Sequence, residues 1–166
     1  MSFERVMAAL RIMQQSYRLR PSWDIAPALP KDPLLLTEAQ IRKWPIFSSS
    51  PKGPPLLTDA HIRAWTVGTG FARSELYDRI AIYLARGFHR SELDFEFCDE
   101  IVNTIHGIIT LADESRPDLF WQVFLAFDSG EFYRDKDRSQ DPIEAFTRPL
   151  IAKVIEQYSS EYPDVR

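Results

Sequence analysis

The 166-residue sequence has a single cysteine, only six glycines and no long uninterrupted hydrophobic run. One cysteine cannot form an internal disulfide or a cysteine-based zinc site, and such scarcity suits the reducing cytosol. No apolar stretch approaches the roughly 20 residues of a membrane-spanning helix, and charged residues interrupt the first twenty positions where an export signal would be apolar. The scattered glycines argue against a nucleotide-binding loop. We therefore expect a cytoplasmic protein with no membrane association and no cofactor.

Prolines and apolar spacing divide the chain into three parts of one expected domain. Residues 1–20 are predicted to form a helix, because apolar residues recur every three or four positions. Eight of the twelve prolines lie within residues 21–70, where proline removes amide donors and disfavours continuous helices or central strands. Residues 71–166 are predicted to form an acidic helical body. The expected fold is all-α: a compact helical bundle with a mostly irregular, proline-rich segment.

The net charge of −4 is unevenly divided. Residues 1–70 hold nine basic and five acidic residues, whereas residues 71–166 hold eleven basic and nineteen acidic ones, a balance of −8. Such a surface would repel nucleic acid and attract a basic partner. The alternative is a solvated acidic surface that only keeps the protein soluble.

A short sequence duplication lies inside the proline-rich segment. Residues 35–44 (LLTEAQIRKW) resemble residues 56–65 (LLTDAHIRAW), and each copy starts with a threonine suited to an N-cap. We expect two helices of one or two turns, each pressing an isoleucine and a tryptophan onto the body. Thr37 with Gln40 matches a capping box, whereas Thr58 with His61 does not. Coincidence and true duplication both remain open.

Helical periodicity predicts the elements of the body. Residues 72–86 are expected to form a helix that Gly87 ends. Ser91 and Asp94 match a capping box that is expected to open the next helix, around residues 95–112. This second helix is apolar over so much of its circumference that we expect it to be the central one, with a close neighbour at its internal glycine.

Two further helices are predicted near the C-terminal end. Residues 118–127 have aromatic and branched side chains that also suit a buried strand, but Pro117 and an acidic first turn favour a helix. Asp141 and Pro142 form the clearest helix start in the chain. Pro149 is expected to kink that helix or divide it into two abutting ones.

No catalytic or metal-binding pattern is complete in the sequence. Oxygen-bearing residues alternate over 135–141 as in a calcium loop, but Gln140 and Phe146 stand where glycine and glutamate are needed. Cys98 lies in an apolar setting that predicts packing rather than reactivity. The histidines lack the short spacings of a zinc site; they are His61, His89 and His106.

One segment combines acidic and aromatic residues in a way that suits binding of a basic protein. Aromatic side chains supply area to bury at an interface, and carboxylates steer the encounter. The alternative is an ordinary loop whose two aromatic side chains are tucked inward. The predicted partner-binding residues are Asp128, Glu131, Phe132, Tyr133, Asp135 and Asp137.

The stretch from about residue 76 to 158 resembles the small all-helical immunity proteins of contact-dependent growth inhibition and related polymorphic toxin systems. The resemblance is carried by a short first helix, by LDFEFCDE opening the second, and by the segments FWQVFLAFDSGEFYR and DPIEAFTRPLI. It implies no catalysis. It implies instead a protein that binds a cognate toxin domain tightly and blocks its active site or a required surface.

We therefore expect a non-enzymatic cytosolic immunity protein whose acidic surface binds a basic toxin domain. Two alternatives stay open. One is a small metal-dependent hydrolase built on His61, His89 or His106 with nearby carboxylates, which would need a concave pocket. The other is a structural or regulatory subunit whose first seventy residues wrap a partner or a second copy of the chain.

Overall fold

The structure is a computed structural model that describes residues 2–18, 56–133 and 138–165. Within these ranges the chain forms six α-helices, one π-helix and no strand, so the all-α prediction is confirmed. The first copy of the duplication, at residues 35–44, lies outside them. The elements are α1 (Phe3–Arg18), α3 (Asp59–Thr69), α4 (Arg73–His89), α5 (Phe95–Leu111), α6 (Asp118–Asp128), η3 (Ile143–Thr147) and α7 (Arg148–Tyr158).

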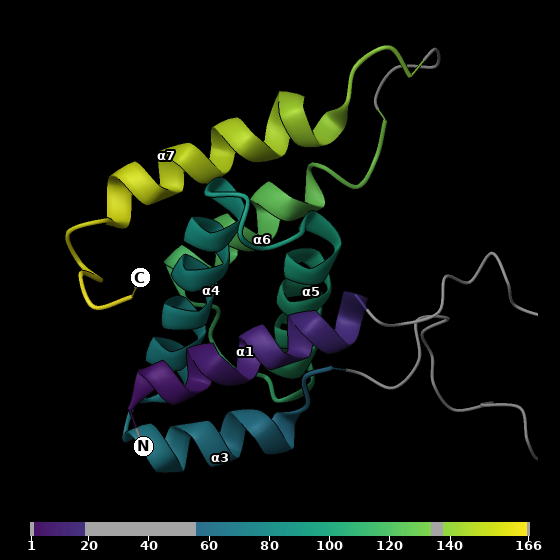
Figure 1. The fold of residues 1–166 in the computed structure, drawn as a ribbon. Coiled ribbons are helices and arrows are strands. Elements are labelled where there is room, and N and C mark those ends of the chain that lie inside the picture. The colour runs from purple at the N-terminus through teal and green to yellow at the C-terminus, as the bar shows by residue number, and fades with distance from the viewer. Residues whose placement is uncertain (1, 19–55, 134–137, 166) are drawn as a thin grey trace, which may run out of the picture.

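The central helix is α4, which packs against α3, α5, α6 and α7. Ten of its residues are buried. The prediction that residues 95–112 form the central helix is wrong, because one side of α5 faces solvent: Leu111 is 91% exposed. Figure 1 shows α1 crossing in front of α4 and α5, with α7 at the opposite end of α4 from α3.

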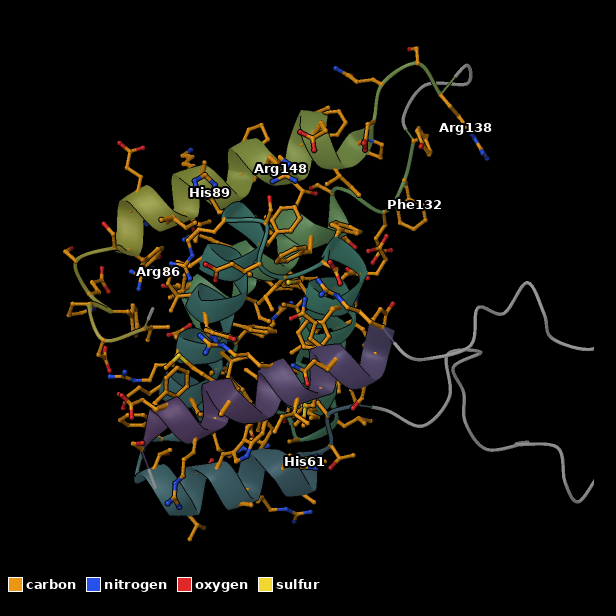
Figure 2. All side chains as sticks on the ribbon, viewed as in Figure 1. His61, Arg86, His89, Phe132, Arg138 and Arg148 are labelled. Atoms are coloured by element: carbon orange, nitrogen blue, oxygen red, sulfur yellow. The ribbon has the colours of Figure 1, made fainter. Side chains whose placement is uncertain are left out.

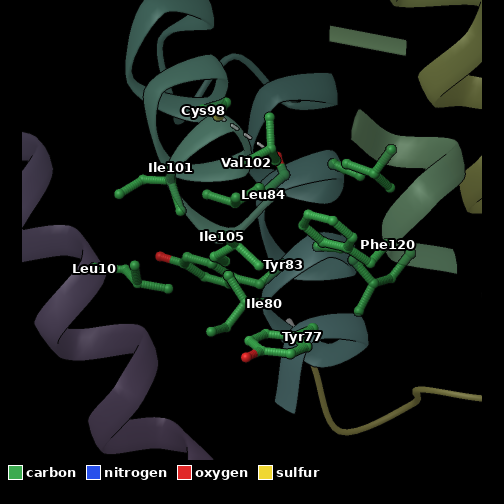
Figure 3. Packing of buried hydrophobic residues seen from close by; sticks show 14 of the residues in the cluster. Leu10, Tyr77, Ile80, Tyr83, Leu84, Cys98, Ile101, Val102, Ile105 and Phe120 are labelled. Atoms are coloured by element: carbon green, nitrogen blue, oxygen red, sulfur yellow. Dashed lines mark hydrogen bonds between the residues drawn. The ribbon is translucent and has the colours of Figure 1, made fainter. Parts of the chain in front are cut away.

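All six α-helices contribute apolar side chains to the core, and Figure 3 shows the part where α1, α4, α5 and α6 meet. Cys98 is fully buried among them, and its thiol lies 3.9 Å from the carbonyl oxygen of Leu84. Burial raises the pKa of this thiol well above its ordinary value, so it stays protonated and packs as a small apolar group. Fully buried members of the core include Leu10, Tyr77, Ile80, Leu84, Ile101, Val102, Ile105 and Phe120.

The end of α4 differs from the prediction, since the helix continues for two residues past Gly87. A Cβ at Gly87 would lie 2.5 Å from Cδ1 of Leu93, so a larger residue there would have to displace the Leu93 side chain. The helix ends where Ser91 adopts a φ of 59°. The Ser91 N–H donates to the Phe88 carbonyl (2.9 Å), and the Glu92 N–H donates to the Gly87 carbonyl (2.8 Å). Ser91 therefore closes α4 in a Schellman motif and does not open α5.

The N-cap of α5 is Asp94, whose extended backbone precedes the first helical residue. Its carboxylate forms an ion pair with Arg18, at the end of α1, with an N–O distance of 2.6 Å. The pair lowers the pKa of Asp94 through its hydrogen bond and charge. This ion pair therefore connects the end of α1 to the start of α5 at the protein surface.

Helix α3 contains residues 59–65 of the second copy of the duplication, and Thr58 of that copy is its N-cap. Ile62 and Trp65 are buried against the body, as predicted. The helix is eleven residues long, which exceeds the one or two turns expected. His61 completes a capping box, because its Nδ1 accepts a hydrogen bond from the Thr58 N–H at 3.1 Å. The expectation that Thr58 and His61 form no capping box is therefore wrong.

The prediction of a helix over residues 118–127 is confirmed by α6. Pro117 stands at its N-cap and makes no side-chain hydrogen bond there. The acceptor comes from α4 instead: Oδ1 of Asp78 accepts a hydrogen bond from the Phe120 N–H at 2.8 Å. A carboxylate from a neighbouring helix thus satisfies one of the free N–H groups at this helix start.

Pro149 divides the last helical segment, as predicted. The chain forms the π-helix η3 and then continues as α7 with Pro149 in its first turn. Proline lacks an N–H and its ring would clash with the carbonyl of residue 145 in a regular helix, which the wider π turn avoids. Oδ1 of Asp141 accepts a hydrogen bond from the Ile143 N–H at 2.9 Å, so Asp141 caps this segment as expected.

The residues after α7 turn back against α4. The Arg86 guanidinium donates to the carbonyl oxygens of Tyr162 (2.7 Å), Ser159 (3.2 Å) and Val165. Val165 is fully buried. Figure 2 shows Arg86 between the body of the bundle and the segment that follows α7.

Candidate partner-binding site

The predicted partner-binding residues that the structure describes lie at the end of α6 and in the turn after it. Phe132 is 66% exposed and Tyr133 is 50% exposed. Figure 2 shows Phe132 projecting away from the helices. Asp128 and Glu131 are exposed beside them. The structure therefore places two aromatic and two acidic side chains on one exposed turn, and the alternative of inward-tucked aromatic side chains is wrong.

The remaining predicted residues, Asp135 and Asp137, lie outside the described residues. Past this gap, the Arg138 guanidinium carbon lies 5.3 Å from the centre of the Tyr133 ring, within the range of a cation–π contact. The calcium-like pattern falls partly in the same gap, and its last member, Asp141, serves as the helix cap.

The turn is anchored by close packing at Gly130. A Cβ there would collide with Oγ1 of Thr147 and lie 2.9 Å from Cε2 of Phe95. The Gly130 N–H donates to the carbonyl of Phe127 at 2.8 Å, which continues the last turn of α6. The backbone beneath the exposed side chains is therefore held between η3 and the start of α5.

Asn103 of α5 connects this turn to a second acidic region. Its Nδ2 donates to Oδ1 of Asp99 at 3.0 Å and to Oε1 of Glu131 at 3.2 Å. Glu96 and Glu100 lie on the same side of α5, since residues three and four apart are neighbours on a helix. These α5 residues were not among the partner-binding residues predicted from the sequence. The spacing of their carboxylates, three and four positions apart, indicated that they share one side of the helix.

A part-buried polar network joins the ends of α3, α4 and α5. The Tyr77 hydroxyl donates to Oε2 of Glu114 at 3.0 Å, and Nη2 of Arg73 donates to Oδ1 of Asp59 at 2.8 Å. Nε of Arg73 lies 2.7 Å from Oε1 of Glu114, close enough for an ion pair but misaligned for a hydrogen bond. Arg73 lowers the pKa of Asp59, and burial raises that of Tyr77. The carboxylates of Asp59 and Glu114 are both paired with Arg73. The network therefore stabilises the packing of α3, α4 and α5 against one another.

The three histidines occupy separate elements. His61 caps α3, and His89 lies exposed in the last turn of α4 (Figure 2). His106 of α5 stacks on Phe124 with ring centres 4.4 Å apart. Within the described ranges, no group of three or more histidine, cysteine, aspartate or glutamate side chains is placed to hold a metal ion.

A shallow groove of about 570 Å³ lies between α1 and the segment after α7. It is lined by Glu4, Met7, Arg11, Pro163 and Asp164. This lining contains no histidine or nucleophilic side chain, so the groove does not supply the pocket that the hydrolase alternative needs.

The comparisons with known proteins give no relative. No protein-family model matches the chain, and no curated protein or solved structure matches it. Among the described residues, no helix has the length and apolar character needed to cross a membrane.

Proposed function

We propose that this protein is a non-enzymatic binding protein, an immunity protein that neutralises a cognate toxin domain by direct contact with a basic surface. The observation that carries the proposal is the exposure of Phe132 and Tyr133 beside Asp128 and Glu131 on one turn. Asp135 and Asp137 belong to the same proposed contact segment. The immunity role itself rests on the resemblance of residues 76–158 to helical immunity proteins.

The energetics of the turn support binding. Burying a phenylalanine side chain contributes about 1.5–3 kcal/mol of favourable free energy. Phe132 is exposed in the free protein, so burial of its ring in a complex would add this contribution to the binding free energy. Asp128 and Glu131 would steer a basic partner and fix its orientation. The packing of Gly130 and the hydrogen bond from Asn103 to Glu131 position the turn, which lowers the ordering cost of binding at residues 128–131.

Co-expression with the products of neighbouring genes tests the proposal. Each neighbour would be tagged and purified with the wild-type chain, with the double variant Phe132→Ser/Tyr133→Ser, and with Ile12→Ser. Ile12 is a matched control, because it is 63% exposed on α1. We expect stoichiometric co-purification of wild type and control, and an affinity about tenfold or more lower for the double variant.

Two results contradict the proposal. In one, no neighbouring gene product binds stoichiometrically. In the other, the double variant binds and protects cells as well as Ile12→Ser does.

A further inference from the structure

Negative charge is concentrated in one part of the described structure. Residues 95–133, from α5 to the turn after α6, contain eight acidic residues and only Arg116 as a basic one, a net charge of −7. Residues 59–94 hold five of each sign, and α1 has a net charge of +2. Residues 138–165 hold three basic and five acidic residues, so the negative potential of the described bundle originates mainly at α5, α6 and the turn that follows.

Helices α5 and α6 pack side by side in opposite directions. His106, in the second half of α5, stacks on Phe124 of α6, whereas Asn103, one turn earlier, reaches Glu131 beyond the end of α6. The first half of α5 and the end of α6 therefore lie together. This end of the pair carries the exposed or partly exposed carboxylates of Glu96, Glu100, Asp128 and Glu131, whereas that of Asp99 is buried.

The other end of the pair combines aromatic and apolar side chains with the exposed carboxylates of Asp113 and Asp118. Trp121 is partly exposed and stacks on Phe124 with ring centres 5.1 Å apart. Leu125, one turn further along α6 toward the acidic end, is 42% exposed. The Arg116 guanidinium carbon lies 4.3 Å from the centre of the Trp121 ring, so this end also has a positive charge.

Gly107 leaves open space on α5 between these two ends. A Cβ at Gly107 would meet no atom within 4 Å among the described residues, so the expectation of a close neighbour there is wrong. Glycine inside a helix costs about 0.5–1 kcal/mol relative to alanine. Nothing within the described bundle requires this glycine, whereas a backbone approaching from outside would.

We infer that the outer surface of this pair, here called the α5–α6 face, docks an amphipathic basic helix of the partner protein. The inference rests on the proposed function and specifies its partner. Lysine or arginine side chains would lie over the acidic end, and an apolar side chain would lie over Gly107 against Trp121 and Leu125. From Glu96 to Gly107 the face is about 16 Å long at 1.5 Å per residue, or about three turns of a docked helix. Helices pack at about 8–10 Å between axes, and a glycine at the contact permits the closest approach.

A defined peptide tests the α5–α6 face without knowledge of the natural partner. The probe is an amidated 16-residue helical peptide with lysines on one face of its first half and leucines on the same face of its second half. The matched peptide has glutamate in place of each lysine. Amide shifts of the isotope-labelled full chain would be recorded by NMR during titration. We expect the lysine peptide to shift amides of the α5–α6 face, with affinity falling as salt rises, and the glutamate peptide to have no effect.

The variant Gly107→Gln should fill the open space without disturbing the fold, because glutamine is a good helix former. We expect it to weaken the lysine peptide about tenfold. The control Ala8→Gln adds the same side chain to an exposed position of α1 and should leave the affinity unchanged.

Several outcomes overturn the inference. Shifts confined to the turn at 128–133, equal shifts with both peptides, or equal affinity for Gly107→Gln and wild type would each refute it. Concentration-dependent shifts of the same amides without peptide would instead identify a second copy as the occupant. The experiments also separate this inference from the proposed function. If the Gly107→Gln variant still binds a neighbouring gene product and the Phe132→Ser/Tyr133→Ser variant does not, the proposed function stands and docking at the α5–α6 face is refuted. If no neighbouring gene product binds, but the lysine peptide shifts amides of the α5–α6 face, only the proposed function is contradicted.

Discussion

Asp78 should contribute more to the stability of the folded protein in mild acid than at neutral pH. Its carboxylate is partly buried between α4 and α6, where it accepts the Phe120 N–H. Burial, together with the charges of Asp118 and Glu161, raises the pKa of Asp78 to about 6 against the lowering effect of the Phe120 hydrogen bond. The folded protein therefore binds this proton more tightly than the unfolded chain does, in which the pKa is 3.8.

The sign and size of the effect follow from linkage. A raised pKa in the folded state contributes stability at low pH that is lost as the pH rises through about 6. With about 1.4 kcal/mol per pKa unit, the full effect is about 3 kcal/mol, of which about 2 kcal/mol falls between about pH 4.5 and 7.5.

Asp78→Asn isolates this contribution, because the amide oxygen still accepts the Phe120 N–H but no longer titrates. Urea unfolding of both proteins at pH 4.5 and 7.5 measures the free energy of unfolding. The difference between variant and wild type should change by about 2 kcal/mol in favour of the variant at the higher pH. Asp59 and Asp94, whose pKa values are lowered by arginine, give the opposite slope in both proteins and cancel.

Asp78→Ala is the control for the hydrogen bond and should lose about 1 kcal/mol of stability from the missing cap. If Asp78→Asn and wild type show the same pH dependence, the reasoning about the buried carboxylate is refuted.

Three further substitutions test the backbone. Gly107→Ala should raise the free energy of unfolding by about 1 kcal/mol in a urea titration, because the added Cβ meets no neighbour; a loss of stability would show that the space is filled. Gly130→Ala should lower it by about 1–3 kcal/mol because the Cβ collides with Thr147, so an unchanged melting temperature would disprove the tight packing. Ser91→Gly should add up to about 1 kcal/mol by relieving the left-handed conformation at φ 59°, and a decrease in thermal stability would contradict this.

The sequence predicted a helix start or division correctly where a residue within the same helical segment determines it. Pro117 and Pro149 each act on their own helix, so the start of α6 and the division between η3 and α7 were both predictable. Gly87 could not be interpreted in the same way, since it serves the side chain of Leu93 and the helix ends instead at Ser91 in a conformation that serine rarely adopts. The helix at residues 95–112 was placed at the centre because its composition is apolar, but composition does not show which helix others surround.

The sequence predicted which residue types make up the candidate site, but it did not predict their exposure or the link to α5. The run of acidic and aromatic residues was visible, yet aromatic residues in a loop suit the core and the surface equally, so only the structure gives the exposure of Phe132 and Tyr133. The link between Asn103 and Glu131 joins positions 28 apart in sequence and depends on the antiparallel packing of α5 and α6. Two sequence signals could have pointed to α5: the 3–4 spacing of its carboxylates and the presence of only one basic residue between positions 95 and 133.

The contacts of Arg86 tie the last helix to the centre of the bundle. A helix end normally frays because its final carbonyl groups have only water as a partner. Here one guanidinium on α4 binds carbonyl groups at three positions after α7, so opening this end also breaks bonds to the central helix. Amide hydrogens around residues 159–165 should then exchange with solvent in the same cooperative unit as α4. Lysine could not take over this role, since its compact ammonium group cannot span three acceptors as the planar guanidinium does.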